Sequence, residues 1–141
     1  LIDGMPKVRV TRRLHFSAGH RLHSPDYDDE TNRAVFGACS NPNGHGHNYE
    51  LEVAVEGEID PKTGYVIDVK RLRDLVTERV VGEMDHANLN VDVPWLRGVN
   101  PTAENLAVEI WNRLTGQLDG ARLVSVKLWE TQRNLVEYRG E

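Results

Sequence analysis

Hydrophobic and polar residues alternate along four segments of this chain, which is the pattern of half-buried β-strands. The first segment spans residues 7–16, with apolar positions Val8, Val10, Leu14 and Phe16. The second carries Tyr49, Leu51, Val53 and Val55, and the third, residues 122–130, carries Val124, Val126, Leu128 and Glu130 on one face. Residues 134–139 pair with the third segment as a closing hairpin. The alternation therefore predicts four strands.

Two further segments repeat apolar residues at helical spacing. Asp68 is typical of a helix N-cap, and the apolar residues after it predict a helix over about residues 69–83. Asn100-Pro101-Thr102 opens the second helix, with Asn100 or Thr102 as its cap and Gly116 near its end. Residues 21–44 show neither period and predict a long loop, and residues 84–100 predict an irregular segment.

The predicted order is strand, strand, helix, helix, strand, strand. Neighbouring strands joined in this way form an antiparallel sheet, so we expect four antiparallel strands with two helices on one face, an α+β fold. A chain of 141 residues fits a single domain, residues 1–141, around one hydrophobic core. Such a sheet has two open edges, which favours association of several copies through strand edges.

The composition excludes several classes of function. The net charge is −5 and no basic stripe is visible, so we expect no nucleic-acid partner. The longest apolar runs are a few residues and residues 1–5 lack the pattern of a signal peptide, so we expect no membrane partner. The single cysteine, Cys39, cannot form an intramolecular disulfide, which favours a cytoplasmic protein.

Three of the six histidines have the arrangement of metal ligands. His45 and His47 are two residues apart at the start of the second strand, so both point to the same face. His20 follows the first strand, whose end lies beside the start of the second in an antiparallel pair. Three imidazoles predict a zinc site with a fourth position open for water or substrate. The alternative is three unrelated histidines on the surface or in the core.

Cys39 and the pair Asp85-His86 are candidates for proton transfer. Cys39 lies six residues before His45 in a segment rich in glycine and asparagine. It is a fourth zinc ligand, a base or nucleophile, or an inert buried thiol. A carboxylate next to an imidazole fixes its tautomer and stabilises its cation, which suits Asp85 and His86 for acid–base chemistry. The alternative for Asp85 is a role in a turn or helix cap.

Two glutamates are candidates for binding a ligand. Glu130 is in phase with the apolar face of its strand, where a buried carboxylate needs a partner. It suits a ligand with adjacent N–H donors, such as the edge of a heterocycle, unless the strand ends there and Glu130 reaches solvent. Glu104, in the first turn of the second helix, is mostly explained by the helix dipole.

Several motifs in one order resemble the 6-pyruvoyl-tetrahydropterin synthase family. They are Phe16-Ser17-Ala18-Gly19-His20-Arg21-Leu22, Cys39-Ser40-Asn41-Pro42-Asn43-Gly44-His45-Gly46-His47-Asn48-Tyr49, Asp85-His86-Ala87-Asn88-Leu89, Pro101-Thr102-Ala103-Glu104-Asn105 and Glu130-Thr131. The resemblance runs from about residue 8 to the end of the chain. Separate motifs in the right order are far more specific than any single one.

The resemblance implies a tunnelling fold, in which ββααββ units form trimers whose sheets close a barrel, and two trimers stack into a hexamer. It also implies a reaction of tetrahydrobiopterin biosynthesis. In this reaction a zinc-dependent lyase converts 7,8-dihydroneopterin triphosphate to 6-pyruvoyl-tetrahydropterin with loss of triphosphate. Magnesium would accompany the triphosphate.

The same resemblance implies roles for the candidate residues. The three histidines would hold one zinc ion per subunit, and Cys39, as thiolate, would be the base. Asp85 and His86 would tune Cys39 or act as a second acid–base pair, from a neighbouring subunit. Glu130 would anchor the amino and N–H edge of the pterin ring, with assistance from Glu104.

A sibling enzyme of queuosine biosynthesis, 6-carboxy-tetrahydropterin synthase, has the same fold, metal and substrate. Its members often have fewer residues between the cysteine and the paired histidines than the Ser40–Gly44 segment here, so the run from Asn41 to Tyr49 favours the pyruvoyl enzyme. A non-catalytic oligomer that binds zinc or pterin is the alternative from another class of function.

Overall fold

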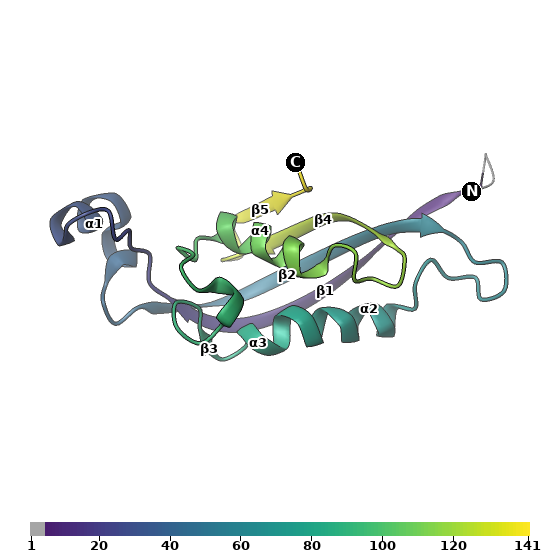
Figure 1. Ribbon diagram of the computed structural model, residues 1–141, viewed down its shortest axis with the longest axis horizontal. Helices are drawn as coiled ribbons and strands as arrows, with labels where there is room; N and C mark the ends of the chain where they lie inside the picture. The colour runs from purple at the N-terminus through teal and green to yellow at the C-terminus, as the bar shows by residue number, and fades with distance from the viewer. Residues whose placement is uncertain (1–4) are drawn as a thin grey trace.

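A long pair of antiparallel strands forms the centre of the molecule (Figure 1). The computed structural model describes residues 5–141. In it, β1 (Lys7–His20) pairs with β2 (His45–Glu58) over the whole length of both strands. β4 (Arg122–Trp129) is antiparallel to β2, and β5 (Leu135–Tyr138) is antiparallel to β4. The short strand β3 (Ala87–Asn88) lies beside β1, so the sheet order is β3-β1-β2-β4-β5.

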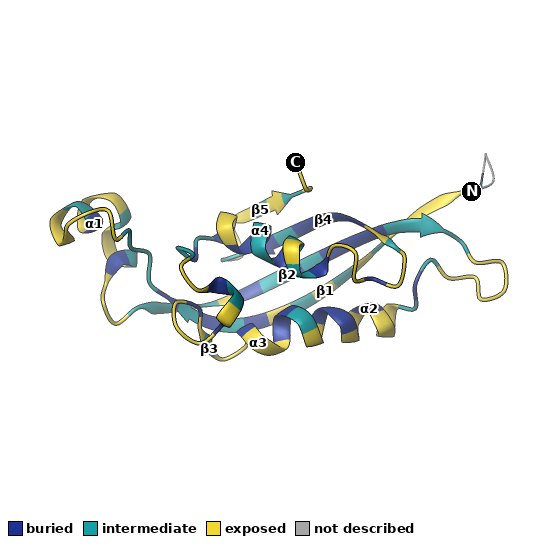
Figure 2. Ribbon diagram, viewed as in Figure 1, coloured by how far each residue is buried: buried dark blue, intermediate teal, exposed yellow. Residues whose placement is uncertain are grey.

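Helices pack against the sheet along its length. The first helical stretch comprises α2 (Val69–Val76), a π-helical turn η2 (Thr77–Val81) and α3 (Gly82–Met84), and it contacts β1. The second, α4 (Ala103–Leu114), contacts β4 and β5 and is preceded by a 3₁₀ turn, η3 (Pro94–Leu96). One core fills the space between the helices and the sheet, and Figure 2 shows buried residues on both. Its largest fully buried aliphatic side chains are Leu51, Leu72, Met84, Leu89, Leu96, Leu106, Ile110, Leu114, Leu118 and Leu128. The α+β class is confirmed.

The predicted long loop over residues 21–44 is wrong in part, because it contains helical structure. α1 (Asp29–Phe36) and the 3₁₀ turn η1 (Gly37–Ser40) lie beyond the ends of β1 and β2 (Figure 1). The Asp28 carboxylate caps α1 by accepting a hydrogen bond from the Thr31 amide at 2.7 Å, and Gly37 ends the helix at a φ of 59°. Asn32 is the only buried residue of α1, so the helix has no apolar stripe and its periodicity is not visible in the sequence.

The predicted sheet of four antiparallel strands is also wrong in two respects. The first strand does not end at residue 16 but continues to His20, and its inner face alternates through Phe16, Ala18 and His20, all of them buried. β3 is a fifth strand, parallel to β1, within the segment that was expected to be irregular. A strand of two residues is too short to show any period, so only its contact with β1 defines it.

The predicted helices are confirmed, with one irregularity. The first extends from Val69 to Met84 and Asp68 caps it, accepting from the Lys70 amide at 2.9 Å. Its π turn is closed by the Gly82 amide on the Thr77 carbonyl, and a Cβ on Gly82 would lie only 2.8 Å from that oxygen. Of the two candidates for the cap of the second helix, the structure selects Thr102, whose hydroxyl accepts from the Asn105 amide.

Association of several copies into a barrel stays a prediction. Within residues 5–141, β1 pairs with β3 only at Ala18 and Gly19, so most of that side of β1 has no strand beside it. Residues 1–4 of the predicted domain, which include most of the segment inspected for a signal peptide, lie outside the described residues. None of the described helices has the length and apolar character needed to cross a membrane.

Candidate metal centre

The register of β1 and β2 brings the three candidate histidines together. His20, the last residue of β1, lies directly opposite His45, the first residue of β2, and His47 lies opposite Ala18. The Nε2 atoms of His20 and His45 are 3.1 Å apart, and one ring nitrogen of each histidine lies within 4.8 Å of the others. The three side chains therefore share one face of the sheet and point at one small volume, as the two-residue period of the strands predicts.

The tautomer of His20 is fixed by the chain around it. Its side chain is buried, with 1% of its surface exposed, and its Nδ1 lies 2.8 Å from the carbonyl oxygen of Pro101. A carbonyl oxygen only accepts hydrogen bonds, so Nδ1 must carry the proton. Nε2 is then left with its lone pair directed at His45 and His47.

Burial also favours the neutral form of two of the three histidines. It lowers the pKa of both His20 and His47, because an imidazolium cation is costly to remove from water. The neighbouring histidines lower the pKa of His20 further, whereas the bond to the Pro101 carbonyl and the charge of Glu130 oppose this shift. Neutral imidazoles are the form that binds transition metals.

The donor set fits a zinc ion. The Nε2 atom of His47 is buried and has no hydrogen-bond partner, which is costly unless a ligand satisfies it. Two nitrogens bound to one tetrahedral zinc stand roughly 3.3 Å apart, given Zn–N bonds of about 2.0–2.1 Å. The observed 3.1 Å between two of the ring nitrogens is close to that separation. Zinc would occupy the volume enclosed by the three Nε2 atoms.

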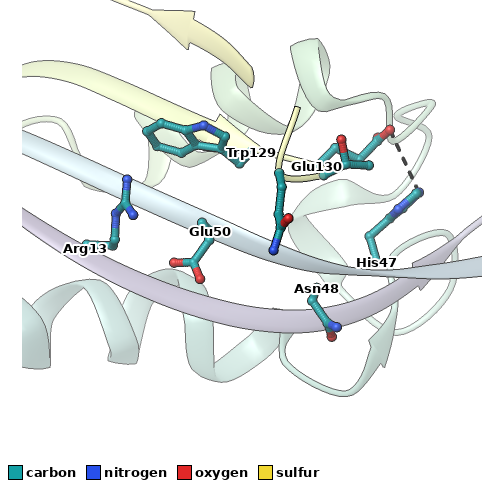
Figure 3. A pocket seen from close by; sticks show the side chains of 8 residues that line it. Arg13, His47, Asn48, Glu50, Trp129 and Glu130 are labelled. Atoms are coloured by element: carbon teal, nitrogen blue, oxygen red, sulfur yellow. Dashed lines mark ion pairs between the residues drawn. The ribbon is translucent and has the colours of Figure 1, made fainter. Parts of the chain in front are cut away.

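Glu130 reaches the same volume from the end of β4. Figure 3 shows its carboxylate directed at His47, and the Oε1 atom lies 3.8 Å from His47 Nε2. Its Oε2 atom lies 4.0 Å from His20 Nε2, and the side chain is 25% exposed. The strand ends at Trp129, yet Glu130 faces the histidines rather than bulk solvent alone. It adds a negative charge beside the position of a bound cation.

Glu104 and Glu130 line one cavity of about 260 Å³. Its other walls are Leu22, Phe36, Thr102, Ala103, Asn134, Leu135 and Val136. Glu104 is exposed and lies in the first turn of α4, where an interaction with the helix dipole was expected. It also faces this cavity. The cavity thus combines apolar walls with two carboxylates, which suits a flat heterocycle that carries N–H donors.

A second, wider hollow lies on the other side of Glu130 (Figure 3). It has a volume of about 510 Å³ and is lined by Arg13, His47, Asn48, Glu50, Trp129, Glu130, Thr131 and Gln132. The guanidinium of Arg13 lies over the Trp129 ring at 4.8 Å and donates to Glu52. Arg13 is therefore already paired with Glu52 and is not a free cation for a ligand bound in the hollow.

Cys39 lies in the 3₁₀ turn η1, outside the group of three histidines that could hold a metal. Its carbonyl oxygen accepts from the Leu22 amide at 2.8 Å, which ties η1 to the segment that follows His20. The thiol is half-buried and free. The structure thus gives no support to Cys39 as a fourth ligand within one chain.

Asp85 and His86 form a pair at the edge of β1 that faces β3, opposite the edge that pairs with β2. The Asp85 Oδ1 atom accepts from the Ser17 amide at 2.9 Å, and Oδ2 lies 3.0 Å from His86 Nδ1. The hydrogen bond from Ser17 lowers the pKa of Asp85, and its contact with His86 adds to this. His86 adopts a φ of 61°, and its side chain is 83% exposed. Its Nε2 atom therefore has open access from outside.

Tyr49 was not singled out from the sequence, and its ring lies next to those of His20 and His47. The side chain is fully buried and stacks on Phe16, with 4.8 Å between ring centroids. Its hydroxyl lies 3.4 Å from His20 Nδ1, and burial raises its pKa so that it stays protonated. A tyrosine in phase with His45 and His47 on β2 was the available signal.

Comparisons with known proteins agree with this geometry. The model of the family described as 6-pyruvoyl tetrahydropterin synthase matches residues 9–141. The 6-pyruvoyl tetrahydrobiopterin synthases of Pongo abelii and Homo sapiens are 49% and 47% identical over 135 residues, covering 96% of this chain and 93% of each relative. The solved structure of Caenorhabditis elegans 6-pyruvoyl tetrahydropterin synthase superimposes with a TM-score of 0.89 at 38% identity, over 97% of this chain and 98% of that one.

Proposed function

Since this chain belongs to the 6-pyruvoyl tetrahydropterin synthase family, we propose that it is a zinc-dependent lyase. Its substrate would be 7,8-dihydroneopterin triphosphate, and its products 6-pyruvoyl-tetrahydropterin and triphosphate, a step of tetrahydrobiopterin biosynthesis in the cytoplasm. The observation that carries the proposal is the cluster of three histidines beside a cavity with two carboxylates.

His20, His45 and His47 would hold the zinc through their Nε2 atoms, with the fourth position directed at substrate. Zinc bound there would act as a Lewis acid on the side-chain oxygens of the substrate, making the adjacent C–H bond more acidic and stabilising the negative charge that forms. His20 would keep its proton on Nδ1, hydrogen-bonded to the Pro101 carbonyl, so that its Nε2 stays free to bind the ion.

The pterin ring would bind in the cavity between Glu104 and Glu130. An ionised carboxylate accepts two parallel hydrogen bonds, which matches the amino and N–H edge of a pterin. Leu22, Phe36 and Val136 supply apolar walls for the faces of the ring. Because Glu130 also lies within 4.0 Å of His20 Nε2, a ring anchored there would place its side chain near the metal.

Cys39 would remove the proton from the substrate side chain as a thiolate. Asp85 would hold His86 with Nδ1 protonated, and the exposed Nε2 of His86 would exchange protons with Cys39 of a neighbouring subunit. The exposure of this pair and the position of η1 beyond the strand ends support a site shared between subunits of a hexamer. Magnesium would bind the phosphates of the substrate.

Product analysis tests the proposal directly. Purified protein is incubated with 7,8-dihydroneopterin triphosphate and zinc under anaerobic, reducing conditions, and the pterin product is identified by mass spectrometry. We expect 6-pyruvoyl-tetrahydropterin and one equivalent of triphosphate. A 6-carboxy-tetrahydropterin with release of acetaldehyde would instead assign the activity of the queuosine pathway.

Absence of turnover in zinc-loaded protein would favour the alternative of a non-catalytic oligomer that binds zinc or pterin. Elemental analysis of the same sample gives the metal content, and sedimentation gives the number of subunits. One zinc per subunit in a hexamer is the expected result.

A further inference from the structure

Tyr49 places a phenol hydroxyl in the core, at a position where an apolar side chain would pack equally well. Its ring is fully buried and stacks on Phe16 with an interplanar angle of 12°. Phenylalanine would give the same stack without a hydroxyl to satisfy. A buried phenol is costly unless it has a partner. Its one partner among the described residues is His20 Nδ1, at 3.4 Å.

The hydrogen on His20 Nδ1 has two oxygen atoms near it. The Pro101 carbonyl is the closer acceptor at 2.8 Å, and the Tyr49 oxygen is the more distant one at 3.4 Å. The carbonyl only accepts hydrogen bonds, so it fixes the proton on Nδ1 and leaves Nε2 free. With that proton in place, the phenol oxygen is a second, weaker acceptor for it and helps to hold the ring in this orientation.

The Pro101 carbonyl is itself held in place by the start of α4. Thr102 caps this helix through the Asn105 amide, and the Asn105 side chain donates back to the Asn100 carbonyl at 2.9 Å. These bonds enclose Pro101 on both sides. The acceptor of His20 is therefore a rigid group rather than part of a free loop.

The Tyr49 ring also limits the orientation of two ligands. Its centroid lies 6.3 Å from that of His20 with an interplanar angle of 88°, and 5.6 Å from that of His47 with an angle of 76°. Edge-to-face contacts of this kind restrict rotation of the imidazoles about their side-chain bonds. Both rings are held with Nε2 directed at the shared volume before a metal arrives.

We infer that Tyr49 is a positioning residue of the metal centre, whose hydroxyl and ring prepare His20 and His47 for the ion. This inference concerns metal binding and does not depend on which pterin the protein converts. Groups that orient a ligating histidine typically change metal affinity by about 10–100-fold when removed. The Nδ1 hydrogen of His20 is held mainly by the closer Pro101 carbonyl, so we expect the lower end of that range for Tyr49.

The first experiment compares Tyr49→Phe with the wild-type protein. Zinc dissociation constants are measured by competition with a chromophoric chelator, and thermal unfolding is followed without metal. We expect zinc to bind about tenfold more weakly to the variant, whose fold is retained because the ring and its stack remain. Tyr138→Phe, at a residue that packs on Trp111 away from the histidines, is the matched control and should bind zinc as the wild type does.

Equal zinc affinity in folded Tyr49→Phe and in the wild type would overturn the inference. A second measurement needs no variant. Long-range ¹⁵N NMR of the zinc-free wild type reports which nitrogen of His20 is protonated, and we expect Nδ1. Protonation on Nε2 would contradict the role of Tyr49 and Pro101 even if the variant failed to fold. A protein that binds zinc as expected yet converts no pterin would refute the proposed lyase and leave this inference standing.

Discussion

His20 and His86 both lie against β1 near its end, and they are opposite in their surroundings. His20 is 1% exposed, and its Nδ1 proton is bonded to a backbone carbonyl of the same chain. The side chain of His86 is 83% exposed, and within residues 5–141 its one ion pair is with Asp85. His20 belongs to the cluster of three histidines, which lies within one chain. The Nε2 atom of His86 is instead accessible to a substrate or to another subunit.

This difference fits the role proposed for each group. A metal site needs its ligands fixed in advance, which the fourteen-residue strands β1 and β2 achieve through their register. A proton-transferring pair needs access to substrate and to a thiol, and Cys39 lies outside the histidine group.

His45→Ala removes one of the three candidate metal ligands and leaves His20 and His47. We expect zinc affinity to fall by more than about a hundredfold and turnover to be abolished, because a lost ligand costs more than a lost partner of a ligand. Elemental analysis after dialysis measures the metal content. Full zinc content in folded His45→Ala would show that the metal does not bind at this cluster.

Cys39→Ala tests the other region. Turnover is expected to fall by about 10²–10⁴-fold, the usual contribution of a general base, with zinc content and assembly unchanged. Steady-state kinetics and elemental analysis of one preparation give both quantities. Zinc content and thermal stability that fall together would instead identify Cys39 as a structural ligand.

Mixed oligomers test whether Cys39 and the Asp85–His86 pair meet across subunits. Cys39→Ala and His86→Gln are each expected to be nearly inactive as pure proteins. Co-expressed with different tags and purified through both, they should recover about a quarter of wild-type activity, since random assembly leaves that share of shared sites intact. No recovery in mixed oligomers would place all three residues of each site in one chain.

Gly82→Ala perturbs the helix that leads into Asp85 without touching the strands. The added Cβ would meet the Thr77 carbonyl oxygen at 2.8 Å. We expect the π turn to be strained and unfolding to become easier by about 1–3 kcal/mol. Zinc affinity below the melting temperature should remain unchanged. Glu78→Ala, an exposed position in the same turn, is the control for chemical denaturation.

The smallest expected effect is on the pH dependence of the zinc-free protein. Burial lowers the pKa of His20 and His47 below the ordinary value of 6.5. As pH falls below 6.5 the unfolded chain takes up protons that the folded cluster resists, so the folded state loses stability until its own histidines protonate. Above that pH both states are neutral and this contribution is zero.

Urea denaturation at pH values between about 7.5 and 5 measures this slope. His20→Gln removes one of the two groups and should flatten the slope relative to the wild type. Identical slopes for the two proteins would show that His20 is not a buried neutral imidazole in the folded state.

The alternation along β2 was sufficient to place His45 and His47 on one face, and the antiparallel order placed His20 near them. The helix α1 was not predictable, because it buries one polar residue and has no apolar stripe. β3 was missed for a similar reason, since two residues show no period. Tyr49 was read as one more apolar position of β2. The two-residue period shows that its ring faces the core, but it does not show whether the ring also orients neighbouring histidines.

The sequence by itself determined which residue types alternate and where, and hence the strand pair, the helices and the three histidines, because periodicity is a local property of the chain. Tertiary structure decided what those residues touch. The Pro101 carbonyl, eighty-one positions from His20, fixes its tautomer, and the Glu130 carboxylate arrives from β4 beside both His20 and His47. These contacts depend on how helix α4 packs on β4 and how β4 pairs with β2, and no local pattern records the distance between segments so far apart.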